Sequence, residues 1–565
     1  MRTVAAVTPT RRLVAVAAAL LAISGCSVTT PPTSRPGGPT TAARSAGSVP
    51  AVPGSNAGVS GPATSGAATS AASPPGPGRP GSTGPGVVPG SGGLVAPGSA
   101  LANLPDGTPP TGVGIRDAIA AALTEPDLRG RIGVAVLDPR TGQLLYGFAP
   151  RVRFLPASTQ KLFTATAAID ALGAGRRFTT RVVRTSASGA PISLALVGGG
   201  DISLARAPVA PAAPGKPPAV TPVPGAADIA TLAARTVAAL SGVRSLRISV
   251  DASLFTGPRV SPAWIASYLI SGEVSPVSPL TVDAGRVGPG RRQRSAVPEQ
   301  AAAQAFVAAL AARGVHATID PAPVRAPTSA PVVAAVDSPP VAALIAHMLA
   351  ASDNDYAESL LRHIALASRL PATFAGGTRA VRADLVRRGV DPAAVLLADG
   401  SGLSRADRAT PAAIATVLTA ALRDPRLRPV ADGLAVAGVS GTLRDGFTGP
   451  AASGRGRVHA KSGTLAGVSA LAGTIATASA GELVFVLLTD SLPTNLPWRA
   501  RRALELAAAR LAQCGCHNTA PGPRLPAGPL PTGPVPAPTP LVPLTALMAP
   551  TALVSAASGA DQSTR

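Results

Sequence analysis

Aromatic side chains are scarce in this chain and are confined to its middle. Phe, Trp and Tyr together make up 2% of the 565 residues, and none occurs before Tyr146 or after Trp498. Residues 27–112 and 517–565 are dominated by Pro, Gly, Ser, Thr, Ala and Val. Such segments cannot bury enough apolar surface to offset the entropy that ordering costs. We therefore expect a folded part over residues 113–516, between a disordered N-terminal tether and a disordered C-terminal tail.

Long apolar runs, regular glycine repeats and lysine are also missing or rare. No apolar run reaches the roughly 18 residues of a membrane-spanning helix, which excludes a polytopic membrane protein. No strict glycine period occurs, which excludes a collagen-like chain. The net charge is +22, but only three of the 50 basic residues are Lys, and the Arg residues form no block of five or more. A solvated basic surface accounts for this charge, and no motif supports a nucleic-acid partner.

Cysteine occurs only three times, and the first copy follows an apolar segment near the N-terminus. Three Arg residues within the first 12 positions precede apolar residues 13–23, which is the layout of a secretory signal peptide. The segment ends in Ile23-Ser24-Gly25-Cys26, which resembles a bacterial lipobox. We therefore predict a signal peptide over residues 1–26 with Cys26 as the lipidation site. The alternative is an ordinary signal peptide with an incidental Cys.

Both alternatives place the mature chain outside the cytoplasm, as a membrane-anchored lipoprotein or as a secreted or wall-associated protein. Residues 27–112 would then be a flexible tether. The other two cysteines, Cys514 and Cys516, have only His517 beside them, which is too few ligands for a zinc site. A structural disulfide between them and no role at all both remain open. No metal or organic cofactor is implied.

Hydrophobic periodicity predicts strands at both ends of the folded part and helices between them. Strand patterns lie at residues 131–137, 143–148, 178–185, 192–197, 246–250, 458–461, 468–475 and 483–489. Helical patterns lie at residues 157–171, 226–240, 298–313, 341–350, 356–367, 379–388, 411–422 and 499–511. This order of elements favours an α+β fold.

The three lysines mark the segments that can carry chemistry. Lys161 follows Ser158 by three positions, so on a helix the amine and the hydroxyl lie on one face. A Lys beside a Ser can act as its base if the surroundings deprotonate the amine. Lys461 opens Lys461-Ser462-Gly463-Thr464 at a predicted strand, and Ser352-Asp353-Asn354 lies between two predicted helices. Lys216 lies in a proline-rich loop and is expected to be solvated.

These segments, in this order, match the SxxK, SxN and KTG motifs of β-lactamases and penicillin-binding proteins. The folded part resembles the D-alanyl-D-alanine carboxypeptidase/endopeptidase type of low-molecular-mass penicillin-binding protein. The segments similar to that family are Phe154–Leu162, Leu196–Asp201, Ser352–Asn354 with Ala357-Glu358, Asp399–Arg405 and His459–Leu465. Ser158 and Ser352 are 194 residues apart, far more than a class A β-lactamase needs, and the E-x-x-L-N segment of those enzymes is absent.

The resemblance implies a β-lactamase/transpeptidase-like catalytic domain, an antiparallel sheet flanked by helices, over residues 113–180 and 330–516. A smaller α/β domain would be inserted at residues 181–329. It also implies that the chain is a serine D-alanyl-D-alanine carboxypeptidase acting on peptidoglycan peptides and acylated by β-lactams. Endopeptidase action on peptide crosslinks is a further activity that the sequence leaves open.

The family's roles transfer to this chain motif by motif. Ser158 would be the nucleophile and Lys161 its general base. Ser352 would serve in the proton relay, Asn354 would hold Lys161 and the substrate backbone, and Lys461 would supply positive charge near the terminal carboxylate. The residues implied in substrate binding are Ser462, Gly463, Thr464 and Arg405. The backbone N–H groups of Ser158 and Thr464 would form the oxyanion hole.

Two positions depart from the family pattern. Ser462 stands where the family usually has Thr, which preserves the hydroxyl. Trp264 is followed at a spacing of three by Ser267, where relatives that bind a diaminopimelate side chain have Asp, so the side-chain preference is open. We expect Asp201 and Asp399 to form turns. Glu358 is expected to serve in helix packing or an ion pair.

Two other functions compete with the peptidase hypothesis. One is a β-lactam hydrolase or esterase, against which stand the long insert and the missing E-x-x-L-N segment. The other is a non-catalytic scaffold that binds peptidoglycan without turnover. Loss of Ser158, Lys161 or Asn354 would have supported the scaffold, and all three residues are present.

Overall fold

The computed structural model describes residues 110–186, 191–208, 223–288, 290–479, 481–493 and 497–515. Several predicted features lie outside these residues. They are the signal peptide with Cys26, the tail over 517–565, Lys216, Cys516, and all of the tether except residues 110–112. Cys514 is described, and it is disulfide-bonded. Within the described part of the chain, no helix combines the length and the apolar character that crossing a membrane requires.

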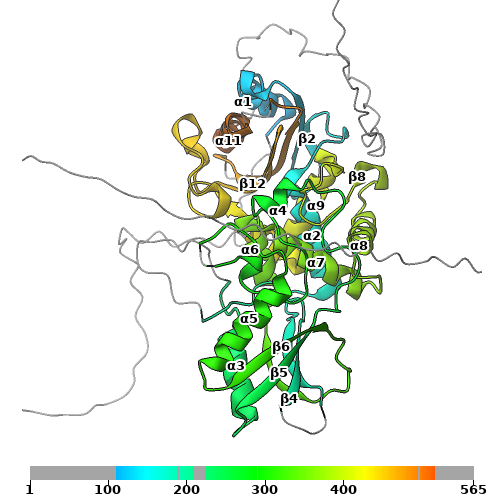
Figure 1. The fold of residues 1–565 in the computed structure, drawn as a ribbon. Coiled ribbons are helices and arrows are strands. Elements are labelled where there is room, and N and C mark those ends of the chain that lie inside the picture. Colours follow the sequence, from blue (N-terminus) through cyan, green and yellow to red (C-terminus); the bar gives the residue numbers. More distant parts are fainter. Residues whose placement is uncertain are drawn as a thin grey trace, which may run out of the picture. The chain divides into compact units, whose positions relative to one another are not determined.

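The larger sheet is antiparallel and has six strands (Figure 1). In spatial order these are β10 (Ala435–Val436), β11 (Val458–Leu465), β12 (Val468–Ala476), β13 (Glu482–Asp490), β1 (Arg131–Leu137) and β2 (Leu144–Phe148). The central strand β13 shows why this sheet is covered on both faces. Val484, Val486 and Leu488 belong to one hydrophobic cluster, whereas Phe485 and Leu487 belong to another. Because neighbouring residues of a strand face opposite sides, both faces of the sheet are buried.

Different helices cover the two faces of this sheet. The helices α1 (Gly112–Leu123) and α11 (Pro497–Gln513) contribute Ile115, Ile119 and Leu504 to the cluster on one face. The other face is covered by α9 (Pro411–Arg423), and the cluster on this side also contains residues of α2 (Lys161–Leu172), α6 (Val341–Ala351), α7 (Asn354–Ala367) and α8 (Phe374–Arg387). The short elements of this region are α10 (Arg428–Asp432), β8 (Val395–Leu396) and β9 (Arg408–Ala409).

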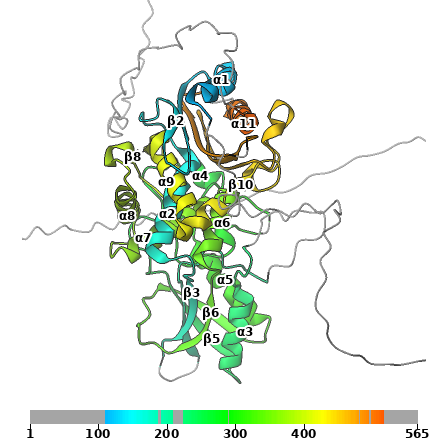
Figure 2. The ribbon, with the colours of Figure 1, turned by 180° about the vertical axis from the view of Figure 1, so that it is seen from behind.

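The second sheet has five strands and is mixed (Figure 2). Its order is β6 (His316–Pro323), β5 (Ser245–Asp251), β4 (Ile192–Val197), β3 (Thr179–Arg184) and β7 (Val332–Asp337). The strand pairs β4–β5 and β5–β6 are parallel, and the remaining pairs are antiparallel. Such parallel pairs need crossover helices, which here are α3 (Ile229–Ala239) and α5 (Pro298–Ala311). The one-turn helix α4 (Ser267–Ile270) lies between β5 and α5.

The predicted α+β fold with an antiparallel sheet and a second sheet is confirmed. Among the longer elements, the structure adds three that the periodicity did not predict, namely α1, β6 and β7, and it also adds the short elements α4, α10, β8, β9 and β10. The second sheet begins at Thr179 and ends at Asp337, on either side of the predicted insert. The domain boundaries at 180/181 and 329/330 stay a prediction.

A glycine on α8 allows that helix to pack against α7, which carries Asn354 at its first position. A Cβ placed on Gly377 would lie 2.7 Å from the carbonyl oxygen of Leu361. We expect Gly377→Leu to force the two helices apart and to lower the free energy of unfolding by about 2 kcal/mol. Urea denaturation followed by circular dichroism measures this change. The exposed Arg379→Ala on the same helix is the control, and equal stability of both variants would contradict the packing argument.

Candidate active site

The segment that carries Ser158 begins with a strained backbone. Ala157 has a φ of 45°, in the left-handed region that non-glycine residues rarely adopt. A Cβ on Gly402 would lie 2.6 Å from the carbonyl carbon of Ala157, so the loop around residue 402 packs here only because that residue is glycine. Strain of this kind costs about 1–3 kcal/mol and persists where the surrounding structure enforces it. The turn holds the partly exposed Ser158 one helical turn before the buried helix α2.

Lys161 is the first residue of α2, and its side chain is fully buried. Its Nζ lies 2.9 Å from Ser158 Oγ, 2.6 Å from Asn354 Oδ1 and 2.8 Å from the carbonyl oxygen of Ser401. Burial lowers the pKa of Lys161 to about 8, although Asp399 and Glu358 raise it in part. A measurable fraction of this amine is therefore neutral at physiological pH.

The three partners of Lys161 direct its lone pair toward the hydroxyl of Ser158. The carbonyl oxygen of Ser401 can only accept a hydrogen bond. Asn354 also presents its acceptor oxygen, because its Nδ2 donates to the carbonyl oxygen of Glu273 at 2.9 Å. A neutral amine that donates to both acceptors has only its lone pair left for Ser158 Oγ. This arrangement suits a general base that removes the hydroxyl proton.

A left-handed residue joins the two helices of the Ser352-Asp353-Asn354 motif. Ser352 ends α6 with φ 59° and ψ 31°, and α7 begins two positions later at Asn354. Asp353 caps α7 by accepting a hydrogen bond from the backbone N–H of Asp355 at 3.0 Å. Its carboxylate also forms an ion pair with Arg286 at 3.1 Å. The motif thus aims Asn354 at Lys161 and leaves Ser352 partly exposed.

Lys461 lies on β11, fully buried, and its Nζ donates to the carbonyl oxygen of Ser462 at 2.7 Å. Burial, together with the cations of Lys161 and Arg501, holds the pKa of Lys461 well below its ordinary value. A lowered pKa favours the neutral amine, which disagrees with the positive charge that we predicted for Lys461. A bound carboxylate would raise the pKa again, because a nearby negative charge favours the ammonium form.

The other predicted binding residues follow Lys461 along β11 or lie beside that strand. The hydroxyl of Ser462 shares a 2.7 Å hydrogen bond with the hydroxyl of Thr442. A Cβ on Gly463 would lie 3.1 Å from the carbonyl oxygen of Pro156, so β11 runs directly against the turn that precedes Ser158. Thr464 is exposed. Arg405 is also exposed, and its guanidinium donates to the carbonyl oxygen of Ala466 at 2.8 Å.

Glu358 has a role that sequence reasoning missed. It is fully buried, and its carboxylate accepts the backbone N–H of Ser401 at 2.9 Å and of Gly400 at 3.1 Å. Burial and the neighbouring Asp399 raise the pKa of Glu358 to about 8. The expected helix-packing or ion-pair role therefore describes only part of what Glu358 does. Glu358 also fixes the loop that contains Ser401, and the carbonyl oxygen of Ser401 accepts a hydrogen bond from Lys161 Nζ. The Ala357-Glu358 segment was visible in the sequence, but this contact was not.

Asp399 forms a turn, as expected, and also makes contacts outside it. Its carboxylate accepts the backbone N–H groups of Gly402 at 2.7 Å and Ser404 at 2.8 Å. It also accepts the indole N–H of Trp264 at 2.8 Å. Ser267, at the position of the relatives' Asp, is exposed at the start of α4. Within the described residues, no group of three or more His, Cys, Asp or Glu is arranged to hold a metal ion.

The fold is that of penicillin binding protein 4, and the Ser–Lys–Asn arrangement matches the motifs of β-lactamases and penicillin-binding proteins. Residues 115–296 and 290–511 match the D-Ala-D-Ala carboxypeptidase 3 (S13) family, and the chain belongs to that family. It is a serine-type D-Ala-D-Ala carboxypeptidase, as the sequence predicted. A cell-wall peptidase of this family works outside the cytoplasm.

Two curated relatives are similar over most of their length. The chain is 35% identical over 414 residues to carboxypeptidase DacB of Mycolicibacterium smegmatis, covering 72% of this chain and 85% of that protein. It is 30% identical over 502 residues to a D-alanyl-D-alanine carboxypeptidase of Actinomadura sp. strain R39, covering 74% of this chain and 88% of that protein.

A solved structure shares the fold. The crystal structure of penicillin binding protein 4 from Haemophilus influenzae matches with a TM-score of 0.55 at 23% identity. The match covers 69% of this chain and 98% of that one. The same protein has also been solved in complex with a β-lactam.

The buried amine predicts a pH dependence of acylation. Because the base form of Lys161 grows as the pH rises toward 8, we expect the acylation rate to rise about tenfold per pH unit below 8 and to level off above it. In Asn354→Asp, a carboxylate replaces the amide that lies 2.6 Å from Nζ and raises the pKa of Lys161. The part of the pH profile in which the acylation rate rises should therefore shift to higher pH by at least about one unit. Stopped-flow measurement with a chromogenic β-lactam from pH 6 to 10 records both profiles.

The matched control is Gln513→Glu, which makes the same change from amide to carboxylate at an exposed position near the end of α11. Its profile should coincide with that of the wild type. A wild-type rate that does not change between pH 6 and 9 would contradict the role of Lys161. A pH profile of Asn354→Asp that coincides with the wild-type profile would also contradict it.

Proposed function

We propose that this carboxypeptidase works through an acyl-enzyme on Ser158, with Lys161 as the general base. The observation that carries the proposal is the contact between the buried Nζ of Lys161 and Ser158 Oγ at 2.9 Å. The two acceptor oxygens of Asn354 and Ser401 on the same amine support it. A solvated structural Lys would have neither the burial nor a pKa lowered to about 8.

The reaction would run in two half-reactions. Ser158 Oγ attacks the carbonyl carbon between the two D-alanines while its proton passes to Lys161 Nζ. The C–N bond then breaks, the leaving amine takes up a proton, and an ester remains on Ser158. Water attacks this ester, the acyl product leaves as a carboxylic acid, and the hydroxyl of Ser158 is restored.

The remaining motif residues would hold the substrate. The backbone N–H groups of Ser158 and Thr464 would donate to the oxyanion. The paired hydroxyls of Ser462 and Thr442, near the amine of Lys461, would receive the terminal carboxylate. Ser352 would relay the proton to the leaving amine. Arg405, exposed beside the turn after β11, would meet the substrate's side chain.

A β-lactam should acylate Ser158 through the same step, since its strained amide presents a comparable carbonyl. We expect the full chain to gain the mass of one penicillin, and Ser158→Ala to gain none. Intact-mass spectrometry over a time course measures both. The control is Ser368→Ala, which removes an exposed hydroxyl just after α7 and should be acylated like the wild type.

The lifetime of the adduct separates the competing functions. A slowly decaying adduct agrees with a penicillin-binding peptidase, whereas rapid drug turnover would favour the β-lactam hydrolase. An adduct that survives in Ser158→Ala would place the nucleophile elsewhere. A folded wild-type chain with no adduct would contradict the proposed acyl-enzyme on Ser158.

We further propose that Cys26 carries a lipid that anchors the enzyme to the outer face of the membrane. The Ile23-Ser24-Gly25-Cys26 segment after a short apolar stretch supports this anchor. Expressed in a bacterium that processes lipoproteins, the full chain should partition into the Triton X-114 detergent phase. Cys26→Ser should enter the aqueous phase, and equal partitioning of both forms would exclude lipidation at this position.

A further inference from the structure

A cavity of about 280 Å³ lies where the parallel strands β5 and β6 of the second sheet end. In sheets with parallel strands, ligands commonly bind beyond the carboxyl ends of those strands. The lining comes from the loop 252–259 after β5, the segment 277–279, the first turn of α5, residues 323–324 at the end of β6, and Arg362 on α7. The catalytic motif residues Ser158, Lys161, Ser352, Asn354 and Lys461 are not part of it. The cavity is therefore a candidate ligand site separate from the active site.

The most deeply buried charge in this lining is that of Arg362, which is 1% exposed. Its Nη1 donates to the carbonyl oxygens of Thr256 at 2.8 Å and Ala372 at 2.6 Å, and its Nη2 donates to that of Pro258 at 2.7 Å. Its Nε has no hydrogen-bond partner among the described residues. Because a guanidinium has five N–H groups, these three bonds leave Nε–H and one N–H of Nη2 without an acceptor.

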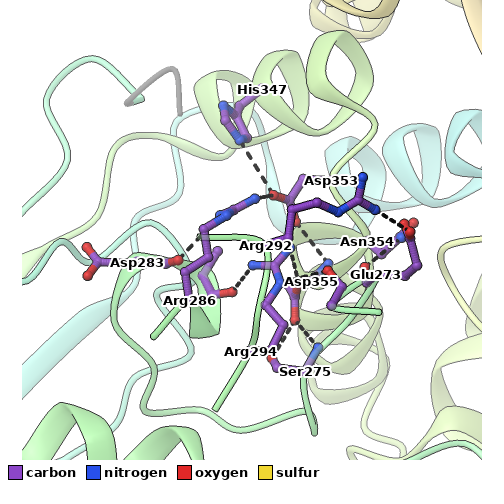
Figure 3. Close-up of polar contacts among 12 residues, drawn as sticks. Glu273, Ser275, Asp283, Arg286, Arg292, Arg294, His347, Asp353, Asn354 and Asp355 are labelled. Carbon is purple, nitrogen blue, oxygen red and sulfur yellow. Dashed lines mark hydrogen bonds and ion pairs between the residues drawn. The ribbon is translucent and has the colours of Figure 1, made fainter. Parts of the chain in front are cut away.

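Other arginines with little exposure lie against a carboxylate, as Figure 3 shows for two of them. The side chain of Arg294 is 6% exposed and pairs with Asp355 at 3.1 Å. That of Arg286 is 17% exposed and pairs with Asp353 at 3.1 Å. Arg362 forms no ion pair within the described part of the chain, although it is buried more completely than either. A negative charge is therefore missing beside Arg362.

The charge of Arg362 persists at neutral pH, because burial lowers the pKa of its guanidinium only to about 10. Glu358 lies one turn earlier on α7, but burial and the neighbouring Asp399 raise its pKa to about 8, so most of this carboxyl group is uncharged at pH 7. The ring of Phe374, 4.2 Å from the guanidinium carbon, and the three carbonyl oxygens compensate the charge in part. A buried charge without an opposite charge is costly, and a bound anion would remove that cost.

The rest of the lining determines which anion fits. Arg259 and Glu299 pair with each other, with 2.8 Å between Nη1 and Oε1, so the net charge of the lining is the single positive charge of Arg362. Apolar side chains, those of Phe255, Val277, Val324 and three prolines, form much of the remaining wall. A cavity below about 300 Å³ is small for a ligand site. A small ligand with one carboxylate, whose two oxygens match paired N–H groups, and a short apolar body fits these features.

We propose that this cavity binds a small monocarboxylate and that Arg362 receives its carboxylate group. The Nε and Nη2 groups would donate to the two carboxylate oxygens, and Phe255, Val277 and Val324 would contact the apolar body. This binding site goes beyond the acyl-enzyme function and does not depend on it. A simple aliphatic acid and a free amino acid are two sources of the same group. Propionate represents the first, and D-alanine, which the enzyme releases, represents the second.

The test measures binding of each compound to the full chain by saturation-transfer difference NMR. The chain is first treated with penicillin, so that the active site is occupied. We expect propionate to bind with a Kd of about 1–10 mM, which a ligand of this size can supply. Inorganic phosphate should bind at least about tenfold more weakly, because it has no apolar body to meet the wall. If D-alanine binds with the same dependence on the cavity, the enzyme's own product is an occupant, and if propionate alone binds, the site takes simple acids.

Two variants change the cavity in different ways. Arg362→Lys keeps the positive charge but removes Nε–H and the paired N–H groups, so we expect the Kd of propionate to rise at least about tenfold. Val324→Trp fills the cavity from a partly exposed position and should abolish binding, and it serves as the test if Arg362→Lys does not fold. The matched controls are Arg313→Lys and Val332→Trp at exposed positions outside the lining, and both should bind like the wild type. Thermal unfolding checks the fold of each variant.

Four results would overturn the proposal. They are no binding of propionate to the wild type, equal binding to wild type and both cavity variants, tighter binding of phosphate than of propionate, and binding that penicillin treatment abolishes, which would place the ligand in the active site. The two proposals fail separately. If penicillin forms no adduct, the acyl-enzyme on Ser158 fails, and loss of propionate binding in Arg362→Lys and Val324→Trp still supports the cavity.

Discussion

The burial of one amine, the Nζ of Lys161, is the constraint on which the rest of the active site depends. An ammonium in solvent would stay protonated and could not accept the proton of Ser158. Burial lowers the pKa of Lys161 to about 8, and two acceptor oxygens use the remaining N–H groups. Because Ser158 and Lys161 are one helical turn apart, the lone pair of the amine then points toward the Ser158 hydroxyl. The same burial is costly, so the fold must supply every hydrogen bond to this amine.

The two acceptors come from segments that are fixed by further buried carboxylates. Asp353 caps the helix that starts at Asn354, and Glu358 accepts two backbone N–H groups of the loop that contains Ser401. Neither carboxylate contacts Lys161 through a hydrogen bond. They act by positioning the oxygens that do.

The segment between β5 and β6 of the second sheet contacts the start of α7, which carries Asn354. The carbonyl oxygen of Glu273 orients the amide of Asn354, and Ser275 and Arg294 bind Asp355 at the start of α7. The material between the first two motifs therefore positions the side chain that holds Lys161, the base in the proposed function.

The sequence by itself determined the features that depend on local spacing. Ser158 and Lys161 are one helical turn apart, and the apolar stretches at residues 131–137, 468–475 and 483–489 identify three strands of the larger sheet. The sequence placed a strand at residues 458–461, and the structure extends it to Leu465. The strand β6 escaped prediction because its exposed residues and prolines show no alternation. Only the tertiary structure decided the pKa of Lys161, because its acceptors lie 193 and 240 positions away and its burial requires helices from the whole chain. The cavity beside Arg362 is decided in the same way, since Arg362 and Thr256 are 106 positions apart and their segments show no common pattern until they fold together.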